Sequence, residues 1–196
     1  RKTTGANGKV MAFEPQPILY DYLKKSIGSF GYKNVKLHNA GVSSEAGSLE
    51  LFVPKAEGLT SLGATFEKRM DQQGHFIDVP VFKIDELLED RERPVSFIKI
   101  DVEGHELEVF KGAEELLMED KPKLLFECEN RHLNDRTVHD VFDYLKDLGF
   151  EGSFFKNGVL KPLDEFDPKT DQAIDSNKEI ENKKAYCNNF VFEFTA

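Results

Sequence analysis

The stretch SFIKIDVEGHELEVFKGAEELL, residues 96–117, decides the fold of this chain. It begins with an apolar run that contains Phe97, Ile98 and Ile100, the pattern of a parallel strand covered on both faces. Polar side chains follow at the carboxyl end of this strand, where open α/β sheets bind their ligands. They are Asp101, Glu103, His105 and Glu106. We therefore expect a functional site directly after this strand.

The second half of the same stretch has the spacing of helices. Gly104 lets the backbone turn sharply, because it has no Cβ. Gly112 stands where one short helix is expected to end and another to begin. The apolar residues that recur at helical spacing are Leu107, Phe110, Ala113, Leu116 and Leu117.

The rest of the chain alternates between strand and helix patterns. Strands are predicted at residues 9–13, 35–37, 49–53, 76–82, 123–128, 153–155 and 189–194. Helices are predicted at residues 18–27, 84–88 and 138–148. In the first helix Ile18, Leu19, Tyr22 and Leu23 form the stripe expected to be buried. Such alternation indicates an α/β sheet.

Two segments together resemble a known family. One ends a strand with Ala12-Phe13-Glu14-Pro15, and the other reads IDVEGHE over residues 100–106, followed by Lys111-Gly112-Ala113. This combination is similar to the FkbM family of S-adenosylmethionine-dependent methyltransferases, and looser similarity covers residues 39–43, 79–88 and 188–194. The resemblance implies a Rossmann-like, doubly wound, mainly parallel sheet with an antiparallel C-terminal strand pair, in a single domain over residues 1–196.

One part of the family pattern has no clear counterpart. The family places a glycine-rich turn after its first strand, and Thr4-Gly5-Ala6-Asn7-Gly8 resembles that turn only superficially, because no apolar strand precedes it. We interpret it as the loop that enters the next strand. The chain also opens on Arg1. The expectation is therefore that the first strand and its turn are missing from this chain, and that the fragment alone is inactive.

The resemblance implies that the cofactor is S-adenosylmethionine. It assigns cofactor contacts to Glu14 and Pro15, to Asn39, Ala40 and Gly41, and to Asp101. An acid such as Glu14, at a strand end, is suited to accept hydrogen bonds from both ribose hydroxyls. The alternative for Glu14 is a helix N-terminal charge that favours the helix dipole. Small residues at 39–41 are expected to let the adenine approach closely.

Methyl transfer to a hydroxyl requires in-line alignment and removal of a proton. The candidates for this chemistry are Asp101, Glu103, His105 and Glu127, and the sequence leaves open which of them is the base. A histidine titrates near neutral pH, but the family pattern tolerates other residues at the position of His105, so the resemblance favours Asp101 or Glu103 near the reacting centre. His105 is alternatively interpreted as an exposed residue of the first helical turn. A divalent metal bound by these residues and His132 is a weaker alternative, because their separate loops give no ligand spacing, and we predict no metal.

Composition narrows the class of partner. The formal net charge is −10 and no basic run is longer than two residues, which argues against nucleic acid and anionic membranes as partners. No segment approaches the roughly 20 apolar residues of a membrane span. Cys128 and Cys187 lack metal-ligand spacing and are expected to be reduced and partly buried. A cytoplasmic location is the expectation. The polar stretch 55–74 is interpreted either as a segment over the substrate mouth or as a surface loop.

The favoured function is an O-methyltransferase that acts on a hydroxyl of a carbohydrate or sugar-bearing metabolite, as the resemblance implies. The partner is then a small-molecule or glycan acceptor, and the oligomeric state stays open. One alternative is a nicotinamide-dependent oxidoreductase, which would use the same acid after the second strand. Another is a non-catalytic Rossmann-like binding domain.

Overall fold

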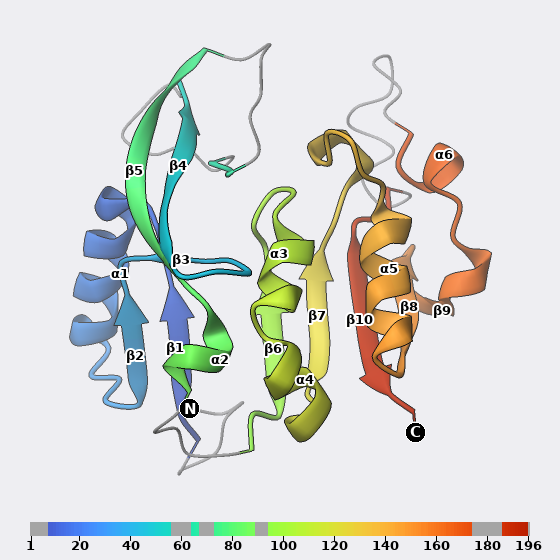
Figure 1. Ribbon diagram of the computed structural model, residues 1–196, viewed down its shortest axis with the longest axis horizontal. Helices are drawn as coiled ribbons and strands as arrows, with labels where there is room; N and C mark the ends of the chain where they lie inside the picture. Colours follow the sequence, from blue (N-terminus) through green and yellow to red (C-terminus); the bar gives the residue numbers. More distant parts are fainter. Residues whose placement is uncertain (1–7, 56–63, 67–72, 89–93, 174–185, 196) are drawn as a thin grey trace.

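The computed structural model describes residues 8–55, 64–66, 73–88, 94–173 and 186–195 (Figure 1). At its N-terminal end, β1 (Val10–Phe13) and β2 (Val35–His38) form a parallel pair, joined by helix α1 (Pro17–Ser29). Proline at the start of α1 costs no hydrogen bond, because the first N–H groups of a helix have no partner within it. This strand–helix–strand unit was predicted from the sequence.

The C-terminal part is a five-stranded sheet with the order β6-β7-β10-β8-β9. Strands β6 and β7 are parallel, whereas β10 runs antiparallel to both of its neighbours, β7 and β8. The predicted α/β class with an antiparallel C-terminal strand pair is therefore confirmed. The bounds are β6 (Phe97–Ile100), β7 (Lys123–Glu127), β8 (Phe150–Lys156), β9 (Val159–Pro162) and β10 (Asn189–Phe194).

A third sheet stands beside these two and was not predicted. It has the order β3-β5-β4, formed by β3 (Gly41–Val42), β4 (Gly47–Pro54) and β5 (Gly74–Phe82). The long strands β4 and β5 pair antiparallel over their whole length and extend away from the other sheets in Figure 1. Of the polar stretch 55–74, residues 56–63 and 67–72 lie outside the described residues. The described Thr65 pairs with Phe52 of β4.

The parallel pair of β1 with β2 and the parallel pair of β6 with β7 belong to two separate sheets. Among the described residues β1 pairs with β2 alone and β6 with β7 alone. Figure 1 shows β1 and β6 as neighbours whose inner edges face each other.

Helices cover one face of the five-stranded sheet. In Figure 1, α3 (Glu106–Lys111), α4 (Glu114–Asp120) and α5 (Val138–Asp147) lie in front of its strands. The prediction that β6 is covered on both faces is wrong in part, because Ile100 is 5% exposed but Phe97 is 52% exposed. The remaining short helices are α2 (Ile84–Leu87), the 3-10 turns η1 (Asn130–His132) and η2 (Leu163–Glu165), and α6 (Pro168–Asp171).

The predicted break at Gly112 is confirmed, and the structure adds a reason for it. Gly112 caps the end of α3 just before α4 begins. A Cβ at this position would lie 2.1 Å from the backbone oxygen of Ser43, which follows β3. Glycine is therefore required by a close approach between two parts of the chain as well as by the helix end.

The hydrophobic core lies between the five-stranded sheet and its helices. Aromatic rings dominate it: Phe126 of β7 lies 5.1 Å from Phe110 and 5.7 Å from Phe190, centroid to centroid. Phe142 of α5 lies 4.7 Å from Phe190. These tilted and edge-on contacts are the arrangements that aromatic pairs prefer.

The predicted buried stripe of α1 is wrong. Ile18, Tyr22 and Leu23 are 53%, 48% and 43% exposed, and α1 contains no buried residue. The helix has a two-stranded sheet to pack on, which is too small to cover its apolar side.

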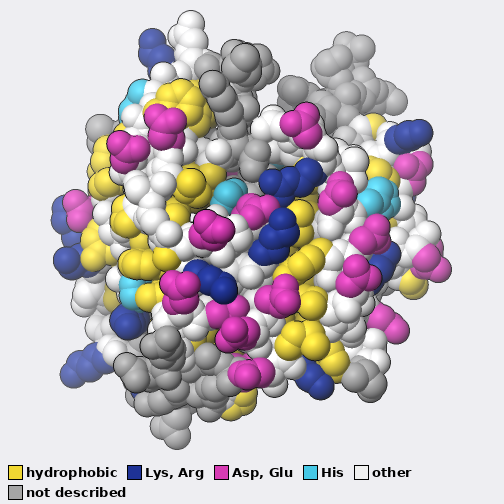
Figure 2. All heavy atoms as spheres, in the orientation of Figure 1, with side chains coloured by type: hydrophobic (Ala, Val, Ile, Leu, Met, Phe, Trp, Pro, Cys, Tyr) yellow, Lys and Arg dark blue, Asp and Glu magenta, His cyan; other side chains and the backbone are white. Residues whose placement is uncertain are grey.

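The surface view shows acidic and basic side chains interspersed over the region of α3, α4 and α5 (Figure 2). Among the described residues, no helix has the length and apolar character needed to cross a membrane. Cys128 and Cys187 are free thiols, as predicted, and both are fully buried.

Candidate functional site

The turn that follows β6 is held in an unusual backbone conformation. Glu103 has φ +56° and Gly104 has φ +108°, so a non-glycine residue occupies the left-handed region. The buried side chain of Glu106 fixes the turn, because its Oε1 accepts the N–H of Gly104 at 3.0 Å. Left-handed backbone at non-glycine residues is concentrated at functional sites.

The side chain of Glu103 leaves this turn toward a histidine. Its Oε2 lies 2.9 Å from Nδ1 of His132, which belongs to η1 and is 8% exposed. The backbone oxygen of Glu103 accepts a hydrogen bond from Oγ1 of Thr65 at 2.7 Å. The structure thus places Glu103 in a carboxylate–imidazole pair.

A second group of polar side chains lies at the end of β7. Glu127 and Glu129 are two residues apart, so they point to the same side of the extended backbone. The amide of Asn188 donates to Oε1 of each of them. Glu129 is 2% exposed and also accepts hydrogen bonds from Arg131 and from the hydroxyl of Tyr186.

These two neighbouring carboxyls have opposite pKa shifts. Burial, followed by the charges of Asp101 and Glu129, raises the pKa of Glu127 to about 7. Burial also opposes ionisation of Glu129, but hydrogen bonds from Arg131 and Tyr186 outweigh it and lower the pKa of Glu129. Pairs of carboxyls whose pKa values are pushed apart are a feature of acid–base sites.

Asp101 lies at the open side of this group. Its side chain is 54% exposed and lies 3.9 Å from the ammonium of Lys99. The negative charges of Asp101 and Glu103 both contribute to the raised pKa of Glu127. The structure therefore brings together three of the four predicted catalytic residues at the carboxyl ends of β6 and β7.

His105, the fourth, contacts a different part of the chain. It is the N-cap residue of α3 and 7% exposed, so the interpretation as an exposed first-turn residue is wrong. Its Nε2 lies 3.0 Å from Oγ of Ser43, and its ring contacts that of Phe66 at 5.0 Å. Its ring nitrogen is thus engaged with the β3 side of the molecule.

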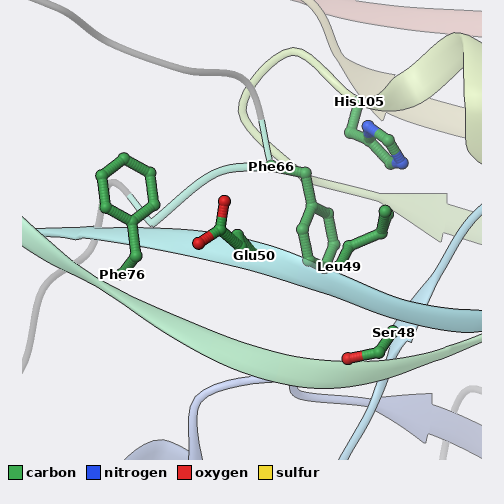
Figure 3. A pocket seen from close by; sticks show the side chains of 6 residues that line it. All are labelled: Ser48, Leu49, Glu50, Phe66, Phe76 and His105. Carbon is green, nitrogen blue, oxygen red and sulfur yellow. The ribbon is translucent and has the colours of Figure 1, made fainter.

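His105 lines a shallow hollow on that side (Figure 3). In Figure 3 the ring of Phe66 lies between strand β4 and His105, with Glu50 beside it. The lining residues are Ser48, Leu49, Glu50, Phe66, Phe76 and His105.

The predicted cofactor residues at the end of β1 form a local cluster. Oε1 of Glu14 accepts the N–H of Gln16 at 2.9 Å, and burial raises the pKa of Glu14. The amide of Asn39 donates to the backbone oxygens of Glu14 and Pro15, at 2.9 and 3.2 Å. Asn39 therefore holds the loop that carries Glu14, a role that the sequence did not indicate.

Ala40 and Gly41 follow this cluster toward β3. Ala40 is 1% exposed. A Cβ on Gly41 would lie 2.5 Å from the ring of Phe66, so Phe66 occupies the space that the small residue leaves. The contact with His105 through Phe66, and the hydrogen bond of Ser43 to His105, link this part of the chain to α3.

Sequence reasoning missed several members of the site. Tyr186 and Asn188 reach Glu129 because β10 inserts next to β7, with Asn189 opposite Glu127, and no local pattern reports that pairing. The sequence groups His132 with Glu103 only as a weaker metal-ligand alternative, and it does not indicate the carboxylate–imidazole pair that they form. Within the described ranges no group of three or more His, Cys, Asp or Glu side chains is arranged to hold a metal ion.

Comparisons with known proteins converge on one family. Residues 1–151 match the family model described as the methyltransferase FkbM domain. Methyltransferase sdnD from Sordaria araneosa is 30% identical over 135 residues, covering 55% of this chain and 52% of the relative. Hexuronic acid methyltransferase AglP from Haloferax volcanii is 34% identical over 111 residues, covering 56% of this chain and 42% of the relative.

A solved structure shares the fold. The crystal structure of methyltransferase FkbM from Methylobacillus flagellatus KT superposes with a TM-score of 0.56 at 17% identity, and covers 94% of this chain and 36% of that chain. The chain spans about half the length of the curated relatives it matches.

Proposed function

The chain belongs to the FkbM family of methyltransferases, and from this we propose that the protein containing it transfers a methyl group from S-adenosylmethionine to a hydroxyl of a carbohydrate or sugar-bearing metabolite. The observation that carries the proposal is the family match over residues 1–151, which includes both the Glu14 loop and the Asp101–Glu106 turn. A similar protein that acts on a hexuronic acid supports a sugar-type acceptor. Two free, buried cysteines are compatible with a reducing compartment, and we propose a cytoplasmic location.

The loop after β1 suits an adenosyl group in one respect. Glu14 is partly buried at a strand end, and one of its oxygens is already fixed by the N–H of Gln16. A carboxylate held in this way can accept ribose hydroxyls, and Asn39 stabilises the loop from behind. When bound, S-adenosylmethionine supplies an electrophilic methyl group on a sulfonium.

The group at the ends of β6 and β7 suits a hydroxyl-bearing acceptor. A carboxylate accepts hydrogen bonds, so Asp101 is matched to a hydroxyl donor of a sugar. The raised pKa of Glu127, about 7, lets this side chain either donate or accept near neutral pH. The site therefore offers both positioning of the acceptor and a route for its proton.

Donor binding is tested with Glu14→Ala in the full-length protein. Removing charge-assisted contacts that contribute roughly 1.5 to 3 kcal/mol should weaken S-adenosylmethionine binding about 10- to 100-fold in a calorimetric titration. Glu45→Ala removes the same carboxylate from an exposed position and should leave the affinity unchanged. Equal affinity in the parent and in Glu14→Ala would remove Glu14 from the donor site.

Acceptor chemistry is tested with Asp101→Asn and Glu103→Gln. Both substitutions keep the side-chain shape, and both residues lie at a strand end outside the core, so turnover should fall more than stability. Methyl incorporation into a panel of neutral and uronic-acid sugars gives the rate, and Glu193→Gln, an exposed change on β10, is the matched control. If both variants turn over at the parental rate, the assignment of acceptor chemistry to the carboxyl ends of β6 and β7 is wrong.

The oxidoreductase alternative differs in its nucleotide. The family match favours a methyl donor. Tight binding of NAD with no binding of S-adenosylmethionine would reverse this order, and binding of neither nucleotide would favour the non-catalytic alternative.

The prediction that isolated residues 1–196 lack donor-dependent activity stays a prediction. The inner edges of β1 and β6 have no strand partner among the described residues, and a strand between them would join the two-stranded sheet to the five-stranded one. We expect a chain extended at its N-terminus to bind S-adenosylmethionine more tightly than residues 1–196 alone. Equal micromolar affinity in calorimetry would show that no further strand is needed.

A further inference from the structure

We propose that His132 is the general base of the methyl transfer and that Glu103 orients it. This inference rests on the proposed O-methyltransferase function. It replaces the four candidates from the sequence with one ring nitrogen, Nε2 of His132.

The distance between the two side chains determines which nitrogen can act. Oε2 of Glu103 lies 2.9 Å from Nδ1 of His132. An ionised carboxylate has no hydrogen to donate, so in the neutral ring Nδ1 carries the proton and Nε2 keeps its lone pair. A carboxylate at one ring nitrogen also stabilises the imidazolium that forms when the other nitrogen takes up a proton.

Both partners are held in place before any ligand binds. Glu103 sits in the left-handed turn that the carboxyl of Glu106 holds through the N–H of Gly104. His132 sits on η1, whose first residue, Asn130, donates its N–H to Gln172 and accepts the N–H of Val138. A pair anchored on both sides fixes the direction in which Nε2 points.

Two of the other candidates, His105 and Glu127, already form hydrogen bonds. Nε2 of His105 is bound to the hydroxyl of Ser43, and its ring lies against Phe66. Glu127 accepts the amide of Asn188. The charged groups around His132 are Glu103 from the turn after β6, Glu106 from α3, and Glu129 with Arg131 from its own segment.

The chemical step balances with these groups. The acceptor hydroxyl oxygen attacks the methyl carbon of the sulfonium donor, and a new O–C bond forms. The S–C bond breaks, and its electron pair stays on sulfur as a neutral thioether. The hydroxyl proton passes to Nε2 of His132 and then to solvent.

The test uses the full-length protein and compares His132→Gln with the parent between pH 5.5 and 9. A general base contributes roughly 100- to 10,000-fold to rate. We expect kcat to fall at least 100-fold in His132→Gln while KM for donor and acceptor changes less than about threefold, and we expect the rise of kcat with pH to disappear. His75→Gln, an exposed histidine on β5, should keep the parental profile. Imidazole added to His132→Gly should restore part of the rate.

A spectroscopic readout tests the pairing independently of activity. Long-range nitrogen–proton NMR of the parent should show His132 protonated on Nδ1 when neutral, and Glu103→Gln should change this signal. A parental kcat and pH profile in His132→Gln, or a neutral ring protonated on Nε2, overturns the inference. An active parent with an unaffected His132→Gln variant rejects His132 alone, whereas a parent that methylates no acceptor rejects the proposed function and this inference with it.

Discussion

The N-terminal and C-terminal parts of this chain share strand and helix patterns but differ in how they are packed. None of residues 8–39 is buried, and the apolar side of α1 faces outward. In contrast, every fully buried member of the main hydrophobic cluster lies at Leu88 or later. The fold is therefore stabilised mainly by the five-stranded sheet and its helices, while the proposed donor-binding loop sits on the less packed part.

The difference has a simple physical origin. An isolated two-stranded sheet offers too little surface to bury a helix, whereas three or more strands with helices on one face enclose a core. The rings of Phe126, Phe142, Phe190 and Phe192 meet in that core, and each is at most 1% exposed. The comparison predicts that equivalent truncations in the two parts have very different effects.

The largest effect is expected for Phe142→Ala. Removing a fully buried ring that contacts four other core phenylalanines should lower the free energy of unfolding by about 3 to 5 kcal/mol. Leu23 of α1 is 43% exposed, so Leu23→Ala should lower the free energy of unfolding by less than about 1 kcal/mol. Urea unfolding of both variants measures the two losses in free energy of unfolding. Similar losses would contradict the difference in packing between the two parts.

Much of the C-terminal part could be predicted from sequence because its signals are local. The apolar periodicity of 138–148 gave α5, and the alternation of Phe190, Phe192 and Phe194 gave β10. The same kind of signal predicted burial of the apolar side of α1, and this was wrong. An amphipathic pattern shows which side of a helix is apolar, but it does not show whether another part of the chain covers that side. The separate sheet that β4 and β5 form with β3 was missed for a similar reason, because the residue pattern of a strand does not indicate which strand it pairs with.

A contact between the two parts gives the next prediction. In Gly112→Ala, the added Cβ would lie 2.1 Å from the backbone oxygen of Ser43, and a backbone neighbour cannot move away cheaply. We expect a loss of roughly 1 to 3 kcal/mol of stability in urea unfolding. Because Ser43 also holds His105, the N-cap residue of α3 that directly follows the Glu103–Gly104 turn, methyl-transfer activity should fall as well. A variant as stable as the parent would mean that β3 and α3 separate easily.

The site illustrates the same limit on prediction. The carboxylates after β6 and β7 were identified from their place at strand ends, a rule that holds for open α/β sheets. The partners of these carboxylates were not, since Asn188 and Tyr186 are about 60 residues away in sequence and reach Glu129 through strand pairing, by hydrogen bonds that span 59 and 57 positions. The side chain of His105 was expected near solvent, but the close packing of Phe66 and Ser43 buries it.

The next prediction concerns Glu127, whose carboxyl lowers the stability of the well-packed part at high pH. The folded pKa of Glu127 is about 7 and its ordinary value is near 4.5, so the folded protein holds this proton more tightly than the unfolded chain. The stability that this proton provides is complete below pH 4.5 and is lost as the pH rises toward 7. Glu127→Gln should therefore raise stability at pH 8 by about 1 to 2 kcal/mol, allowing for solvent screening, and by nothing at pH 4.

Urea unfolding at the two pH values measures this difference. Glu193→Gln, which removes an exposed carboxylate paired with Lys123, is the control at both. An equal effect of Glu127→Gln at pH 4 and pH 8 would show that the Glu127 carboxyl is not held protonated in the folded state. The gain is expected to accompany a loss of activity, because the same carboxyl faces the proposed acceptor site.

The smallest effect is expected for a second glycine-to-alanine change, Gly28→Ala in the exposed helix α1. A Cβ on Gly28 in α1 would meet nothing within 4 Å, and its backbone is helical. Alanine reduces the conformational freedom of the unfolded chain, so Gly28→Ala should raise stability by about 0.5 to 1 kcal/mol, opposite in sign to Gly112→Ala. If α1 unfolds separately from the well-packed part, the gain will appear in the helical circular dichroism of an early transition and not in the main one. A gain in the main transition would instead show that the two parts unfold together, and would make the contrast between them one of packing density alone.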